Sequence, residues 1–388
     1  MQITEVREAS HYIASPMRNA VIDFSQMTVS LVALITDVRV HGKRVVGFGF
    51  NSNGRYAQSG LLRERFFPRL LAAAPDSLSD AAGELDPWRI HQALLENEKP
   101  GGHGERSVAV GIIDMAVWDA LAKAHDIPVA VYLAERFGRE RPLDSVSVYA
   151  AGGYYHPDGD LTSLRREIRS YLDLGYTRVK MKIGGAPLDE DLRRIEAVIQ
   201  EVGEPGRVAV DANGRFSAAE AIRYGEALAP LDLAWYEEPV DPLDYASLSD
   251  VAASYPGPLA TGENIFSTPD ALNLARYGGL RVSTDILQMD PALSYGVVEY
   301  ARMLDALRAC GWSESDQIPH GGHQLNLALG AAFRLGGIES YPGVFEPFGG
   351  FADDQAVEDG FVGWPEVPGV GLEAKAGLRP LLAELWSE

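Results

Sequence analysis

The chain has 388 residues, of which 46% are hydrophobic, so it can bury a core large enough for a barrel-sized domain and a second domain. Its formal net charge of −21 argues against nucleic acid or an anionic membrane as a partner, because either would need a basic face. The single cysteine, Cys310, cannot form an internal disulfide, and the first residues contain no apolar segment typical of a secretion signal. We expect a soluble, cytoplasmic protein of two domains.

Three alternating or β-branched segments open the chain and predict an antiparallel meander. They cover 2–8, 28–38 and 43–50, with an HGK turn between the last two. A helix is predicted at 105–124, where apolar residues recur at helical spacing. These residues are Val108, Ile112, Met115, Trp118, Leu121 and Ala122. An α+β domain over 1–130 is expected.

From about residue 145, strand-like segments alternate with amphipathic helices. The candidate strands are 145–150, 177–183, 207–212, 233–238, 258–263, 285–290, 317–320 and 337–341. Eight strands joined by helices predict an α/β fold with a closed (β/α) TIM-type barrel, over 131–365. The segment 366–388 is predicted to form a loop and a short helix that packs back on the N-terminal domain.

Three carboxylates each end an apolar, strand-like segment at one fixed interval. Asp211, Glu237 and Glu263 are 26 residues apart, since 237 minus 211 and 263 minus 237 both equal 26. One strand plus one helix fills that interval, so a βα repeat would bring all three groups to the same edge of a parallel sheet. Converging carboxylates predict a hard divalent cation, Mg²⁺ in preference to Mn²⁺.

Polar neighbours of these carboxylates have less defined roles. Glu238 competes with Glu237 as a ligand, but strand alternation turns only one of them inward, and the interval of 26 selects Glu237. Asn213 and Asn264 lie close to predicted ligands. They either orient the carboxylates or cap loops.

Lys180 and Lys182 lie two residues apart on a predicted strand and therefore share one face. The apolar residues around them must face the helices, which leaves both lysines pointing toward the barrel axis. A buried lysine is costly without a role. A neighbouring ammonium group and a cation would lower the pKa of one lysine and make it a useful base. The alternative is a solvated lysine face on an edge strand.

Asp290 and His320 end the predicted sixth and seventh strands, so neighbouring strands could set a carboxylate against an imidazole. Such a pair fixes the tautomer of the ring and raises its pKa, which suits proton donation. His323 could instead form a metal pair with His320, although the three carboxylates already supply a site. Glu339 ends the eighth strand and could bind a substrate carboxylate or oxyanion, with Glu346 as a weaker competitor.

Together these motifs resemble the mandelate racemase subgroup of the enolase superfamily over the whole chain. The resemblance implies a modified, enolase-like barrel with an α+β capping domain that the C-terminal tail completes. Several segments also resemble bacterial D-tartrate dehydratases. They are NSNGRY (51–56), NEKPGGHGERSVAVG (97–111), KMKIGGAP, VDANGRF and IPHGGHQ. Muconate-lactonising members carry a lysine at the end of strand six, where this chain has Asp290, so cycloisomerisation is not expected.

The resemblance implies a role for each group. Mg²⁺, or Mn²⁺ as a substitute, would be held by Asp211, Glu237 and Glu263. Lys182 would remove the α-proton of a dihydroxy acid, and Lys180 would stabilise the ene-diolate. His320, supported by Asp290, would protonate the departing β-hydroxyl, which predicts anti elimination. With D-tartrate the products would be oxaloacetate and water.

Specificity is expected from cap loops near 15–28, 51–56 and 97–106. Their candidate residues are Arg18, Asn53, Arg55, Lys99 and His103. Lys99 is expected to bind a second substrate carboxylate and Asn53 a hydroxyl, with solvated loop charge as the alternative.

Other functions stay open. Dehydration of another acid sugar uses the same groups, and a lysine facing a histidine could also exchange an α-proton in a racemase or epimerase. A non-catalytic, metal-binding barrel is the most distant alternative. The resemblance implies a homo-oligomer that takes a small hydroxy diacid or acid sugar.

Overall fold

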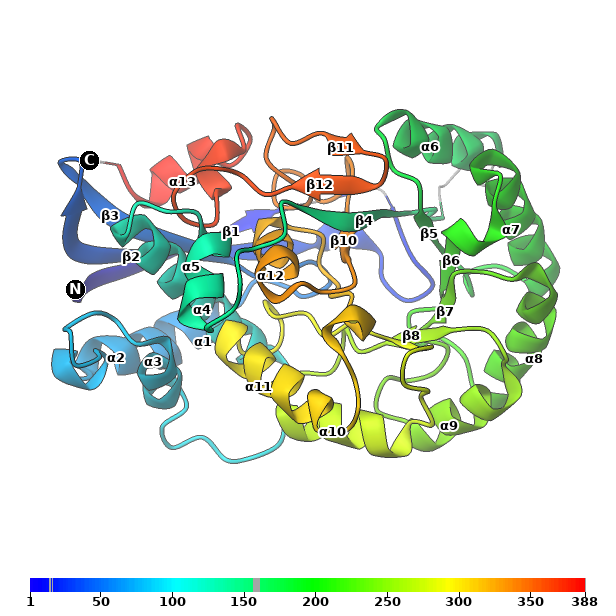
Figure 1. Cartoon of the computed structure of the whole chain (residues 1–388), viewed down its shortest axis with the longest axis horizontal. Helices are drawn as coiled ribbons and strands as arrows, with labels where there is room; N and C mark the ends of the chain where they lie inside the picture. Colours follow the sequence, from blue (N-terminus) through cyan, green and yellow to red (C-terminus); the bar gives the residue numbers. More distant parts are fainter. Residues whose placement is uncertain (14, 16, 156–160, 388) are drawn as a thin grey trace.

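The computed structural model of the chain describes residues 1–13, 15, 17–155 and 161–387. Residue 16, in the expected cap loop 15–28, lies outside them. In Figure 1 a small antiparallel sheet lies on the left and a ring of strands surrounded by helices on the right. The small sheet contains β1 (Ile3–Tyr12), β2 (Thr28–Val40) and β3 (Lys43–Phe50), in that order. This is the meander that the alternating sequence predicts.

Five helices accompany the small sheet. They are α1 (Ser59–Leu61), α2 (Phe67–Ala72), α3 (Pro87–Leu94), α4 (Glu105–Ala124) and α5 (Val129–Arg136). The sheet packs directly on α4 because two glycines of β3 leave room for its backbone. A Cβ on Gly47 would lie 1.9 Å from the Ala116 carbonyl oxygen, and one on Gly49 would lie 2.1 Å from that of Ile112.

The opposite side of α4 faces the barrel. Asp114 of α4 accepts a hydrogen bond from the backbone N–H of Val297 at 2.6 Å, at the start of α11 (Val297–Arg308). All residues from 107 to 122 are therefore buried. An apolar stripe was expected instead, and burial on all sides follows from the position of α4 between the sheet and the barrel.

The ring consists of parallel strands. They are β4 (Ser145–Gly152), β5 (Val179–Lys182), β6 (Val208–Asp211), β7 (Trp235–Glu237), β8 (Leu259–Thr261), β9 (Ile286–Leu287) and β10 (Ile338–Ser340). The strands β4, β5, β6, β7, β8 and β9 pair side by side in that order, and β10 pairs with the other side of β4. The chain has the TIM-type barrel with an α+β N-terminal domain that the sequence predicts.

The seventh predicted strand, 317–320, has only an isolated bridge between Gln317 and Leu287. Its backbone still joins both neighbours. The N–H of Ile318 donates to Leu287 at 2.9 Å, and the N–H of Glu339 donates to the carbonyl of Pro319 at 3.3 Å. The segment therefore closes the ring between β9 and β10, although it is too irregular to form a full strand.

Helices cover the outside of the ring (Figure 1). Besides α11 they are α6 (Leu161–Asp173), α7 (Leu188–Val202), α8 (Ala218–Leu228), α9 (Tyr245–Ser254), α10 (Thr268–Tyr277) and α12 (Gln324–Phe333). Local sequence sets their ends. Ser217 and Glu220 form a capping box at the start of α8, and Gly203, with φ of 84°, ends α7 in the left-handed conformation. Because each helix stops or starts at a defined residue, the chain between them is free to form the next strand.

The C-terminal segment returns to the small sheet. A hairpin of β11 (Val357–Glu358) and β12 (Phe361–Gly363) first pairs antiparallel with β4. Then α13 (Arg379–Leu385) packs on β1 and β2, where Arg7 donates to the carbonyl of Leu385 at 3.0 Å (Figure 1). The tail thus contacts the N-terminal sheet as expected. The domain boundaries 1–130, 131–365 and 366–388 stay predictions.

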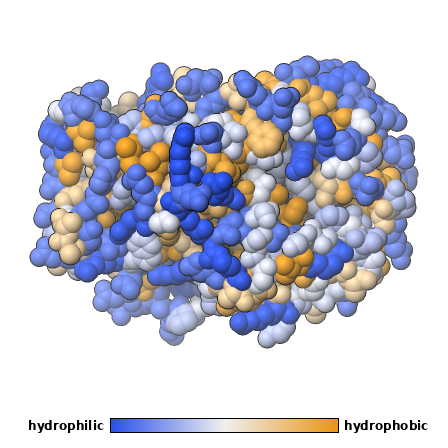
Figure 2. Space-filling model, viewed as in Figure 1, coloured by the Kyte–Doolittle hydropathy of each residue, from blue (hydrophilic) through white to orange (hydrophobic). Residues whose placement is uncertain are grey.

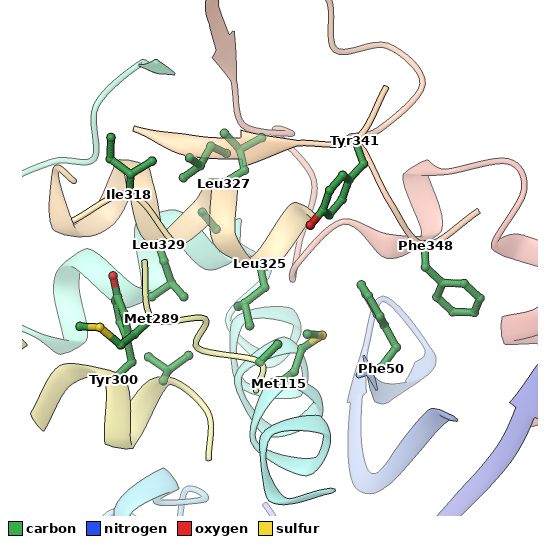
Figure 3. Packing of buried hydrophobic residues seen from close by; sticks show 14 of the residues in the cluster. Phe50, Met115, Met289, Tyr300, Ile318, Leu325, Leu327, Leu329, Tyr341 and Phe348 are labelled. Carbon is green, nitrogen blue, oxygen red and sulfur yellow. The ribbon is translucent and has the colours of Figure 1, made fainter. Parts of the chain in front are cut away.

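The hydrophobic core runs between the two parts. Figure 3 shows Phe50 of β3 beside Phe348, with ring centroids 5.3 Å apart, and Met115 of α4 near Leu325 of α12. Burying one such side chain contributes about 1.5–3 kcal/mol. Hydrophilic side chains cover most of the face in Figure 2. Among the described residues no helix combines the length and apolarity needed to cross a membrane.

Candidate active site

Three carboxylates converge at the C-terminal ends of successive barrel strands. Asp211 ends β6, Glu237 ends β7, and Glu263 follows β8 by two residues. Each offers an oxygen, and these oxygens all lie within 4.8 Å of one another. Asp211 and Glu237 are fully buried. Oxygen donors this close, with little water to separate their charges, fit a divalent cation such as Mg²⁺.

Burial and the neighbouring carboxylates oppose the negative charge of Glu237. Its pKa is raised to about 8, mainly by burial; Lys180 opposes this shift, and the carboxylates of Asp211, Glu339 and Glu263 add to it. Glu237 accepts hydrogen bonds from the Trp235 indole at 2.7 Å and the Gln288 amide at 2.8 Å, and it is ion-paired with Lys180. Donors on several sides therefore fix its orientation.

Both lysines of β5 point into the barrel, as their spacing predicts. The ammonium group of Lys182 lies 2.5 Å from Asp211, and that of Lys180 lies 2.8 Å from Glu339 and 3.4 Å from Asp211. Burial opposes the charge of Lys182, but the attraction of Asp211 outweighs it, so the pKa of Lys182 is raised. The lowered pKa that the sequence analysis expects depends on a bound cation as well as on the neighbouring ammonium group, and it stays a prediction.

His320 is held at both ring nitrogens. Its Nδ1 lies 3.0 Å from Asp290, and its Nε2 lies 2.9 Å from the hydroxyl of Tyr341. Burial opposes protonation of the ring, but Glu263, Glu339 and Asp290 outweigh it and raise the pKa of His320 to about 10. The predicted pair of Asp290 and His320 is present in the geometry. It gives a charged imidazole that can donate a proton.

His323 does not join the metal cluster. It is fully buried, and its Nε2 lies 4.0 Å from Asp290. Burial lowers its pKa to about 4, and its ring packs against Phe50 with centroids 5.3 Å apart. The alternative of a metal pair formed with His320 is not realised among the described residues.

A cavity of about 320 Å³ opens above this group of residues. Residues from both parts of the chain line it. From the barrel come Tyr154, Lys182, Asn213, Gly214, Glu238, Asp241, Pro242, Glu263, Asn264, Leu293, His320, Tyr341 and Phe345. From the N-terminal part come Asn19, Val21, Ile22, Phe24, Asn53, Gly54 and Arg55. Two of the three expected cap loops therefore reach the site.

The predicted substrate-binding residues differ in position. Asn53 is buried and lines the cavity, and neither polar atom of its side chain has a partner among the described residues. Lys99 is exposed on the loop after α3 and does not line the cavity. Its expected contact with a substrate carboxylate stays a prediction. Glu339 lies inside the barrel, where it accepts from the Gly321 N–H at 3.0 Å and the Tyr341 hydroxyl at 2.8 Å.

A family model described as enolase C-terminal domain-like matches residues 163–377, more than half of the chain. The chain belongs to this family. Arabinonate dehydratase from Saccharolobus solfataricus is 29% identical over 284 residues, 71% of this chain and 73% of the relative. L-talarate/galactarate dehydratase from Salmonella typhimurium is 28% identical over 326 residues, 83% of this chain and 76% of the relative. A racemase from Streptomyces coelicolor with bound magnesium has the same fold, with a TM-score of 0.77, 24% identity and 99% of both chains covered.

In this enolase-family chain, strand alternation fails at one important position. Glu238 has a φ of 39°, which breaks the alternation, so it lines the cavity although Glu237 also points inward. Burial raises its pKa well above the ordinary value, and Asn264 donates to it at 3.0 Å. Asn213 donates to Asp211 from its amide at 3.3 Å. Both asparagines therefore orient carboxylates.

Tyr341 and Tyr154 were missed by the sequence analysis. Tyr341 lies two residues after Glu339, so strand alternation alone would have placed it on the same inward face. Tyr154 lines the cavity, and the ammonium group of Lys182 lies 5.5 Å from its ring centroid. No pattern in the sequence marks Tyr154, because it follows β4 in a loop whose course depends on the surrounding fold.

Proposed function

We propose that the protein is a Mg²⁺-dependent dehydratase of a small α,β-dihydroxy acid. Within this class D-tartrate, converted to oxaloacetate and water, is the specific substrate that we infer. The observation that carries the proposal is one cavity lined by Lys182 and His320, next to the three converging carboxylates. The similarity to two acid-sugar dehydratases supports the same reaction class.

Mg²⁺ bound by Asp211, Glu237 and Glu263 would neutralise charge on a substrate carboxylate and compete with Lys182 for Asp211, which lowers the pKa of the lysine. Lys182 then takes the α-proton. It is the lysine that lines the cavity, whereas Lys180 is enclosed among carboxylates. Lys180 stabilises the negative charge that develops on the substrate oxygens.

His320 supplies the proton for the departing β-hydroxyl. Its Nδ1 faces Asp290, so we infer that Nε2, which lies 2.9 Å from the Tyr341 hydroxyl, is the nitrogen that reaches the substrate. Lys182 on β5 and His320 in the segment before β10 enter the cavity from separate parts of the ring, and we infer that they flank the substrate. Elimination is then anti, and the enol product tautomerises to a keto acid. Asn53 and Glu339 complete the proposed substrate site, Asn53 by direct contact and Glu339 by holding Lys180.

The experiment is a turnover assay in D₂O with Mg²⁺ on D-, L- and meso-tartrate, galactarate and arabinonate. Keto-acid formation from any of them supports the dehydratase, and oxaloacetate from D-tartrate supports the specific substrate. Deuterium in recovered substrate without a keto acid would favour a racemase or epimerase. Metal binding with no reaction on any acid would point to a non-catalytic barrel.

The proposal includes a homo-oligomer in the cytoplasm. The N-terminal part exposes Tyr12, Val21 and Tyr56, with exposed fractions of 77%, 60% and 49%. A second copy of the chain would cover such residues. Light scattering that gives the mass of a single chain would remove the oligomer from the proposal.

A further inference from the structure

Three basic side chains line the cavity, and two of them face a carboxylate of the chain itself. Lys182 lies 2.5 Å from Asp211, and His320 lies 3.0 Å from Asp290. Arg55 is different. The described residues place no carboxylate within ion-pairing distance of its guanidinium, although the chain carries a net charge of −21. An uncompensated guanidinium on a cavity wall indicates a place for an anion.

Neutral groups hold Arg55 in position. One of its nitrogens donates to the side-chain oxygen of Asn264, and its guanidinium carbon lies 5.0 Å from the ring centroid of Phe266. Asn264 in turn donates from its amide nitrogen to Glu238 at 3.0 Å. The guanidinium is thus fixed next to the cavity by an amide and an aromatic ring. Neither partner cancels its charge, so the charge is available to a ligand.

Asn53 lies two residues before Arg55, a separation of at most about 7 Å along the backbone. Its side chain is 2% exposed, it lines the same cavity, and its oxygen and nitrogen have no partner among the described residues. A carboxamide can both donate to and accept from a hydroxyl, whereas a guanidinium fork matches a carboxylate. The two groups together match a hydroxyl and a carboxylate on one end of a molecule.

We propose that Asn53 and Arg55 bind the far hydroxy-carboxylate end of the substrate, so that the substrate is a hydroxylated dicarboxylate and not an aldonate. This inference rests on the proposed function and names the substrate class of the same cavity. The reacting carboxylate lies at the metal cluster beside Lys182, and the second carboxylate pairs with Arg55. A cavity of about 320 Å³ is at the low end of small-molecule sites, which fits a short acid.

Substrate pairs that differ only at the far end test this inference. Tartrate and galactarate are each compared with the aldonate in which a hydroxymethyl group replaces one carboxylate. The Mg²⁺-loaded chain should prefer the dicarboxylate in kcat/KM by at least about 100-fold, since a site built to bind a group rejects the analogue that lacks it. Arg55→Gln should remove most of this preference, mainly through KM, and Arg55→Lys should restore part of it.

Arg276→Gln is the matched control. Arg276 is exposed on α10 and does not line the cavity, so the variant loses one positive charge outside the site, and its preference should equal that of the unaltered chain. Equal losses on dicarboxylate and aldonate in Arg55→Gln would overturn the inference. Such a result would mean that Arg55 only positions Asn264, and weaker Mg²⁺ binding by the variant would accompany it.

A binding measurement separates this inference from the proposed function. Calorimetry with the Mg²⁺-loaded Lys182→Met variant, in which turnover should be about 10²- to 10⁴-fold slower, should detect binding of tartrate or galactarate. Adding Arg55→Gln should weaken that binding by about 100-fold and leave Mg²⁺ affinity unchanged. This result supports the inference even if the unaltered chain turns over no acid. Dicarboxylate binding that is absent, or unaffected by Arg55→Gln, contradicts it.

Discussion

The hydroxyl of Tyr341 lies 2.9 Å from Nε2 of His320. The same hydroxyl donates to Glu339 at 2.8 Å, so its oxygen is left to accept a proton from the histidine. With Nδ1 directed at Asp290, both ring nitrogens of His320 then carry protons. The proposed acid is therefore oriented and charged before a substrate binds, and the Tyr341 oxygen accepts its Nε2 proton until a substrate hydroxyl replaces it as the acceptor.

Tyr341→Phe should lower kcat by about five-fold and change KM little, because the loss of one hydrogen bond costs about 1 kcal/mol. The alkaline limb of the pH–rate profile should also move, since His320 loses a partner that fixes its proton. Steady-state kinetics from pH 6 to 10 would measure both effects. An unchanged profile would show that Tyr341 only packs against the ring.

Lys182→Met should lower turnover by about 10²- to 10⁴-fold, the contribution typical of a general base. The methionine side chain is similar in length to that of lysine, so the barrel interior stays filled. Mg²⁺ binding should be retained or tighter, because Asp211 no longer pairs with an ammonium group at 2.5 Å. Kinetics and calorimetry on one preparation test this pair of effects, and residual activity near that of the unaltered chain would exclude Lys182 as the base.

Glu263→Gln should weaken Mg²⁺ binding by about ten-fold or more, since one charged ligand is lost. Of the three proposed ligands, Glu263 is the one that is partly exposed, so its replacement disturbs the core least. The control is Glu238→Gln. Among the described residues Glu238 does not belong to the group whose oxygens lie within 4.8 Å of one another, so the Mg²⁺ affinity of this variant should change little. Similar losses in both variants would mean that Glu238 is also a ligand.

Asp114→Asn should change the pH dependence of stability. Burial raises the pKa of Asp114 to about 8, whereas an aspartate in an unfolded chain ionises near pH 4. Between these values the folded chain holds a proton that the unfolded chain has lost, so stability falls as pH rises through this window. The difference in melting temperature should favour the variant increasingly from pH 4 to 8. A constant difference would contradict the raised pKa.

Gly47→Ala should destabilise the protein by about 3 kcal/mol or more, because the new Cβ would lie 1.9 Å from the Ala116 carbonyl oxygen. The sheet and α4 would have to separate. Gly60→Ala is the control, since nothing lies within 4 Å of a Cβ there, and its effect should stay within about 0.5 kcal/mol. Urea titration of both variants measures the difference.

The regular parts of the fold were predictable because their spacing is local. Period-two alternation located β1, β2 and β3, and the interval of 26 residues placed Asp211, Glu237 and Glu263 at one edge of the barrel. These signals depend only on neighbours along the chain. The inward direction of Lys180 and Lys182 follows from the same rule.

Other features depend on packing between distant segments. Burial of α4 on all sides requires both the sheet and α11, and no periodicity within the helix reveals this. Glu238 turns into the cavity through a left-handed backbone. Lys99 and Arg55 lie in two cap loops, and only the folded chain distinguishes the exposed lysine from the arginine held by Asn264. The sequence analysis named both residues as candidates and preferred Lys99 for the second substrate carboxylate.

The contact between α13 and β1 has a consequence for biosynthesis. This contact joins Arg7 and Leu385, which lie 378 residues apart in the chain. On the ribosome the N-terminal sheet emerges first, yet one of its faces stays uncovered until translation has passed α13. Until then the apolar residues of β2 are accessible to chaperones. If translation stalls within the barrel, these residues stay exposed and the nascent chain is prone to aggregate.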